Sequence, residues 1–128
     1  MRWILTIFIA AMAVVGCQRG ADNANDFTAS LSVTPDPPRV GAAQVAVSLR
    51  DTVGQPVTGA QVELEGTMSH AGMTPVIAAA TEDAPGVYRA DLEFTMAGDW
   101  IIIVRATLTD GRTWQRQIDL PGVQGKAP

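Results

Sequence analysis

Residues 87–94 read Val-Tyr-Arg-Ala-Asp-Leu-Glu-Phe, so that apolar or aromatic side chains alternate with charged ones. This period of two indicates a β-strand, because successive side chains of a strand point to opposite faces of a sheet. A helix would scatter the same residues around its circumference. One face of the strand is therefore expected in a core and the other in water, as is typical of antiparallel sheets.

Six further segments repeat the pattern on either side of this stretch and are separated by turn residues such as Gly, Pro and Asp: 28–34, 44–50, 60–65, 76–80, 100–107 and 113–120. Between the last two, Asp110-Gly111 predicts a hairpin turn. No segment carries an apolar stripe with the helical period. The sequence thus predicts an all-β protein, an immunoglobulin-like antiparallel β-sandwich of about seven strands.

The expected core is built from the largest apolar side chains. Tyr88, Phe94 and Trp100 lie on apolar faces of predicted strands, and Ile101-Ile102-Ile103 follows directly. Because the strand from Trp100 is apolar on both faces at its start, we expect it to be central and covered on both sides. The predicted domain comprises 27–121 and is followed by a disordered tail over 122–128.

The amino terminus has the features of an export signal. Arg2 precedes an apolar run of 12 residues, Ile4 to Val15, that is interrupted only by Thr6. A membrane-spanning helix needs about 20 such residues, so the run predicts a signal peptide over 1–16 rather than a permanent span.

The end of that signal carries a lipidation motif. Val14-Val15-Gly16-Cys17 resembles the bacterial lipobox, in which the signal is cut before a cysteine that then receives lipid. Cys17 is the only cysteine, and only a thiol can form the thioether to diacylglycerol. The alternative is an ordinary signal peptide followed by a cysteine without that role. We predict that Cys17 is lipidated, that 17–26 form a flexible tether, and that the membrane-anchored protein faces the periplasm or the exterior.

Charge and composition exclude several functions. The chain has 128 residues, with 9 Lys and Arg against 13 Asp and Glu, and a net charge of −4. This balance leaves no basic surface for phosphates, so we expect no nucleic-acid partner. A single cysteine excludes an internal disulfide.

Few residues could support catalysis. His70 is the only histidine, and Ser69 beside it would point the opposite way on an extended chain, so a hydrolytic triad is not expected. Glu63 and Glu65 share one face of a predicted strand. A solvated outer face accounts for them better than a carboxylate pair for glycoside chemistry. We therefore predict that the protein is not an enzyme.

One loop concentrates side chains that bind soft metals. Residues 68–75 read Met-Ser-His-Ala-Gly-Met-Thr-Pro and hold two thioethers and one imidazole. Thioether sulfur favours Cu(I) over harder metals, and imidazole binds copper in either oxidation state. Gly72 lets the loop curl, so that Met68, His70 and Met73 could converge on one copper ion. The alternative is that both methionines plug the open end of the sandwich while His70 is solvated.

The chain resembles the YtkA-like group, which is related to the FixH proteins of cytochrome oxidase assembly and to extracytoplasmic copper-handling sandwiches. The matching segments lie between about residues 31 and 120 and are 37–41, 45–51, 54–62, 68–75, 86–90 and 94–100. The resemblance implies copper handling or a part in oxidase assembly. Related members often carry a Met-x-x-Met-Gly-His loop. Here the ligand types are the same and their order differs.

Two functions remain open at this point. The first is a lipoprotein that binds copper through Met68, His70 and Met73. The second is a non-enzymatic module that binds no metal and whose edge strands or loops hold another envelope protein.

Overall fold

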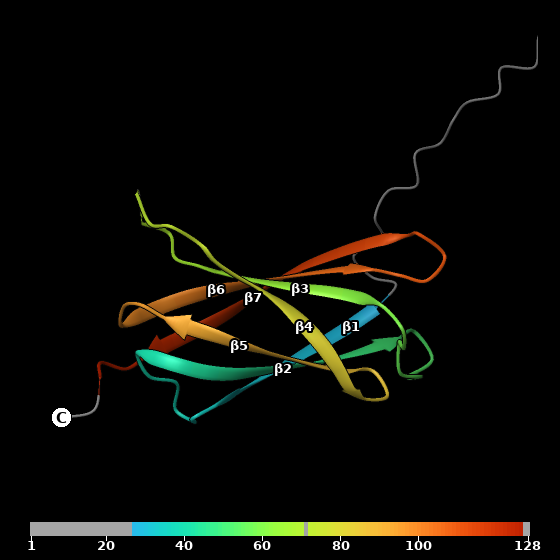
Figure 1. Ribbon diagram of the computed structural model, residues 1–128, viewed down its shortest axis with the longest axis horizontal. Coiled ribbons are helices and arrows are strands. Elements are labelled where there is room, and N and C mark those ends of the chain that lie inside the picture. The colour runs from blue at the N-terminus through green and yellow to red at the C-terminus, as the bar shows by residue number, and fades with distance from the viewer. Residues whose placement is uncertain (1–26, 71, 127–128) are drawn as a thin grey trace, which may run out of the picture.

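The computed structural model describes residues 27–70 and 72–126, and the regular structure within them is all β-strand (Figure 1). The strands are β1 (Phe27–Thr34), β2 (Gly41–Asp51), β3 (Gln61–Thr67), β4 (Val76–Ala84), β5 (Val87–Phe94), β6 (Gly98–Thr107) and β7 (Thr113–Val123). Over these ranges no helix is long and apolar enough to span a membrane. The predicted signal peptide, lipidated Cys17 and tether lie outside the described residues.

The strands form two layers joined through β4. They follow the order β1-β2-β5-β4-β3-β6-β7, and neighbouring strands are antiparallel. The first half of β4 pairs with β3, and its second half, from Thr81, pairs with β5. β4 therefore crosses from one sheet to the other, as Figure 1 shows. This is the four-plus-three arrangement of immunoglobulin domains, so the prediction of an immunoglobulin-like antiparallel β-sandwich is confirmed.

The inner faces of both layers enclose one hydrophobic core. Along β5 the charged residues are exposed, and the side chains between them are buried, namely Tyr88, Ala90, Leu92 and Phe94. Trp100 is 1% exposed and meets Phe94 edge-to-face, with 5.1 Å between ring centroids. Its Nε1 donates to the carbonyl of Met96 at 2.9 Å. The core predicted around Tyr88, Phe94 and Trp100 is confirmed.

β6 is not covered on both sides, contrary to the prediction. Its inner residues Ile102 and Val104 are fully buried, whereas Ile101 and Ile103 on the outer face are only partly buried. The neighbouring strand β3 places the charged Glu65 opposite Ile103. The outer face of β6 therefore mixes apolar and charged groups, and it lies at a surface rather than between two layers.

β7 and its pairing continue beyond the predicted end of the domain. The strand runs to Val123, whose side chain is 2% exposed. Gln124 then exchanges two backbone hydrogen bonds of 2.8 Å with the segment 38–40. The chain passes through Pro121 and Gly122 with a register shift against β6. The prediction of a disordered tail over 122–128 was therefore wrong for residues 122–124.

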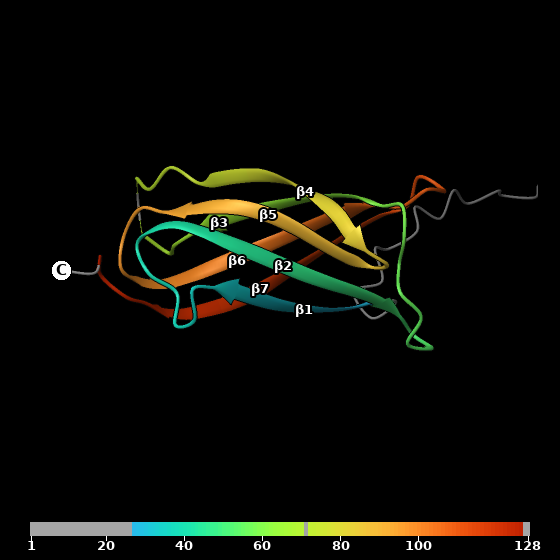
Figure 2. The same cartoon turned by 60° about the horizontal axis from the view of Figure 1, so that its bottom comes forward.

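The sandwich has two distinct ends, which Figure 2 shows at left and right. The β1–β2, β3–β4 and β5–β6 connections share one end, here called the loop end. Phe27, where β1 begins, lies at the other end. There its ring packs against Trp114, with 6.0 Å between centroids, and its carbonyl accepts from Arg116 at 3.1 Å. The chain that precedes Phe27 thus joins the domain at the end opposite the methionine and histidine loop.

Glu82 ties the β4–β5 turn to the loop that precedes β3. Its carboxylate accepts from the backbone amide of Gly59 at 3.0 Å and from that of Gly86 at 2.9 Å. These two bonds, that of Gly59 foremost, hold the pKa of the Glu82 carboxyl below its ordinary value of 4.5. The charged form is therefore favoured by folding.

We expect Glu82→Gln to lower the melting temperature most near neutral pH and least in acid. Because the pKa of Glu82 is lower in the folded state, the stabilisation is present above 4.5 and is lost as the pH falls through the folded value. Thermal melts of both proteins at about pH 7 and about pH 3 measure this, with Glu93→Gln on the same sheet as the matched control. A difference between wild type and Glu82→Gln that is the same at both pH values would contradict the expectation.

Candidate metal site

Strand pairing fixes the base of the loop that carries the predicted ligands. β3 ends at Thr67, and β4 begins at Val76, which pairs with Gly66. The loop between them projects past the ends of the strands (Figure 1), and Ala71 within it lies outside the described residues. Gly72 has a φ of 81°, a left-handed conformation that glycine adopts without strain and that turns the chain back towards β4.

Met68 is a core residue. Its side chain is 6% exposed and belongs to the hydrophobic cluster that fills the sandwich. Its terminal methyl group lies against Gly98, where an added β-carbon would come within 2.9 Å of it. The flexible thioether therefore fills the loop end of the core, as methionine commonly does in irregular gaps.

Met73 and His70 are more accessible than Met68. Met73 is partly buried and packs against the same hydrophobic cluster, whereas His70 is exposed. The structure thus packs both thioethers against the hydrophobic cluster and leaves the imidazole exposed. In the part of the chain that is described, no three His, Cys, Asp or Glu side chains are grouped so as to hold a metal ion. A metal site in this loop would therefore depend on methionine sulfur.

The β5–β6 turn brings a third methionine to the loop end. The side chain of Met96 is 50% exposed, and its carbonyl accepts the hydrogen bond from Trp100. Met96 lies in a different connection from Met68 and Met73, so spacing along the chain does not group it with them. The signal that could have found it is topological, since these two connections share one end of an immunoglobulin-like sandwich.

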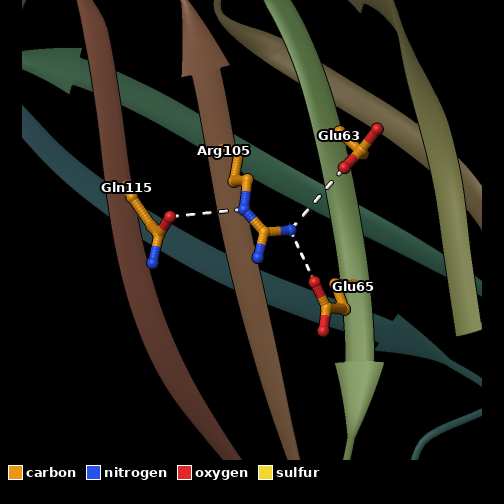
Figure 3. A network of polar contacts seen from close by, with 4 residues as sticks. All are labelled: Glu63, Glu65, Arg105 and Gln115. Carbon is orange, nitrogen blue, oxygen red and sulfur yellow. Dashed lines mark hydrogen bonds and ion pairs between the residues drawn. The ribbon is translucent and has the colours of Figure 1, made fainter. Parts of the chain in front are cut away.

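Glu63 and Glu65 share one arginine on the outer face of the sheet, as Figure 3 shows. Nη1 of Arg105 lies 2.6 Å from Oε2 of Glu65 and 3.6 Å from Oε1 of Glu63. Nε of Arg105 donates to the side-chain oxygen of Gln115 at 3.2 Å. These contacts tie β3, β6 and β7 together, which fits an outer-face ion pair better than an acid/base pair for catalysis.

A groove of about 620 Å³ opens where β4 leaves β3. It is lined mainly by small and charged side chains, among them Ala60, Ala79, Ala80, Glu63, Glu82 and Arg105. None of its lining residues is a methionine or a histidine. This surface could receive part of another protein, but it offers no donor for a soft metal.

The fold and the loop define an immunoglobulin-like β-sandwich that gathers its thioether and imidazole groups at one end. The sequence profile of the family described as YtkA-like matches residues 21–105, and the chain belongs to that family. The predicted resemblance is confirmed. No curated protein matches the sequence.

Solved structures with a similar fold include a bacterial and a murine protein. The PmoD soluble domain from Methylocystis sp. ATCC 49242 (Rockwell) aligns with a TM-score of 0.51 and 14% identity, over 74% of this chain and 90% of that one. Murine CRIg aligns with a TM-score of 0.44 and 11% identity, over 78% of this chain and 99% of that one. At 14% identity the likeness to PmoD shows a shared fold and no more.

Proposed function

We propose that this chain is a lipid-anchored extracytoplasmic protein that binds Cu(I) through Met68, His70 and Met73, for copper handling or oxidase assembly. The observation that carries the proposal is the position of the soft donors. Every methionine of residues 27–126 and the only histidine of the chain lie on two neighbouring connections at the loop end. Membership of the YtkA-like family supports it.

The donor types suit a monovalent soft ion. Thioethers and a neutral imidazole bring no negative charge, and sulfur of this kind prefers Cu(I). Closing the site requires the exposed imidazole of His70 to turn back towards the methionines, and Gly72, two residues on, is a position with few conformational restrictions. Outside the cytoplasm free thiols tend to be oxidised, whereas methionine and histidine stay available for a metal.

Competition against a chromogenic Cu(I) chelator tests the proposal. The full chain, purified in detergent under anaerobic reducing conditions, should withdraw about one Cu(I) per chain from the chelator. Met68→Leu, His70→Ala and Met73→Leu should each weaken binding about tenfold or more, because each removes one ligand of a shared ion. Leucine approximates the volume of methionine, so the core at Met68 stays filled.

The triple variant gives a second readout of the same site, because it removes all three proposed ligands at once. If the wild type fails to compete at any pH, or if the triple variant competes as well as the wild type, the loop is structural and the copper proposal is wrong.

A non-enzymatic envelope interaction module is the second candidate. The burial of Met68 and the exposure of His70 favour it, because they are the features of a loop that plugs the sandwich without holding a metal. The groove between β3 and β4 would then be a contact surface. A protein that binds no Cu(I) but is cross-linked to one envelope partner through residues of this groove would favour the second candidate.

A further inference from the structure

The two connections that carry the methionines approach each other at Gly98, the residue with which β6 begins. Met68, at the start of the β3–β4 loop, places its terminal methyl group where a β-carbon of Gly98 would be only 2.9 Å away. Any larger residue at position 98 would displace this methyl group. Glycine therefore lets the Met68 thioether reach the β5–β6 turn, two residues from Met96.

The backbone at Met96 is anchored to the core while its side chain is free. Its carbonyl accepts from Nε1 of Trp100 at 2.9 Å, and Trp100 is 1% exposed. The side chain of Met96 is nonetheless 50% exposed. A long, flexible thioether on a fixed backbone position can reach a neighbouring ion without disturbing the scaffold.

Core packing does not account for Met96. Met68 and Met73 both contact the hydrophobic cluster, so their presence is explained by packing alone. Met96 is one of the exposed large apolar side chains of residues 27–126, the others being Val53 and Ile77. It is the one that carries a sulfur, and it lies at the end that holds the other two methionines.

We infer that Met96 is a further ligand of the proposed Cu(I) site, which then spans the β3–β4 loop and the β5–β6 turn. This inference rests on the proposed copper function. Three thioethers beside one imidazole strengthen the preference for Cu(I) over harder ions.

Met96→Leu in the full chain tests the inference by the same chelator competition. Affinity for Cu(I) should fall about tenfold or more. The melting temperature without metal should be unchanged, because the replaced side chain is half exposed. Val53→Leu is the matched control, since it puts the same residue at a site that is 76% exposed, in the β2–β3 connection at the other end. It should bind Cu(I) as the wild type does.

Methyl-labelled methionine gives a direct readout of ligation. On addition of Ag(I), a diamagnetic substitute for Cu(I), the methyl resonances of Met68, Met73 and Met96 should shift together. The Met96→Leu variant assigns the Met96 signal. If the wild type binds metal while the Met96 signal stays in place and Met96→Leu keeps full affinity, the inference is overturned and the copper proposal stands. If the wild type binds no metal, both are wrong.

Discussion

Replacing Trp100 with alanine is expected to remove about 3–5 kcal/mol from the free energy of unfolding, which is enough to unfold a small domain. Trp100 is 1% exposed, and its ring lies 5.1 Å from that of Phe94. It also packs on Gly66, where an added β-carbon would lie 3.4 Å from its ring, and it bonds the carbonyl of Met96. The substitution therefore leaves a large cavity and loses a tie to the β5–β6 turn at the same time.

Thermal melts followed by circular dichroism measure this loss. Trp100→Phe should retain part of the stability, because a ring still faces Phe94 although the hydrogen bond is lost. His70→Ala serves as the control at an exposed position and should shift the melting temperature little. A Trp100→Ala protein that melts within about 2 °C of the wild type would show that the core is misplaced.

Replacing Cys17 with serine is expected to abolish attachment to the membrane. Serine has no thiol, so the thioether to lipid cannot form. Several acyl chains give stable anchoring where a single chain is marginal. A protein that carries none of them should no longer be held at the membrane. The prediction follows from Val14-Val15-Gly16-Cys17 and from the absence of a second cysteine in the chain.

Labelling cells with a fatty-acid analogue and fractionating them tests the anchor. The wild type should carry label in the membrane fraction, and Cys17→Ser should carry none. Gln18→Ser introduces the same residue at the next position and should keep the label. Label on Cys17→Ser would mean that the protein is modified elsewhere and that the lipoprotein proposal is wrong.

The strands were predictable where one residue type recurs on each face. In β5 charged and apolar residues alternate, and the geometry of a strand places alternate side chains on opposite faces. The burial of Tyr88 and Phe94 therefore followed from the sequence. The crossing of β4 did not. Residues 76–80 are mostly small and apolar, and their pattern does not say which neighbour the strand leaves or joins.

The donor types of the candidate loop were predictable from the sequence, but the accessibility of its side chains was not. The loop sequence indicated soft donors because Met68, His70 and Met73 are close along the chain. The burial of Met68 depends on its contact with Gly98, the first residue of β6, and that contact is made only when the strands pack together. Met96 is likewise brought to the loop end by topology, which local periodicity does not encode.

The opposite positions of Phe27 and the β3–β4 loop set how far from the start of the domain a bound ion would be presented. The longest strands have 11 residues, a span of about 35 Å at the usual rise per residue. In the anchored protein that we propose, the lipid is attached upstream of Phe27, and the loop is at the far end of that span. A soluble carrier can then meet the loop in open solvent, whereas an acceptor embedded in the same bilayer needs an extramembrane domain tall enough to reach it.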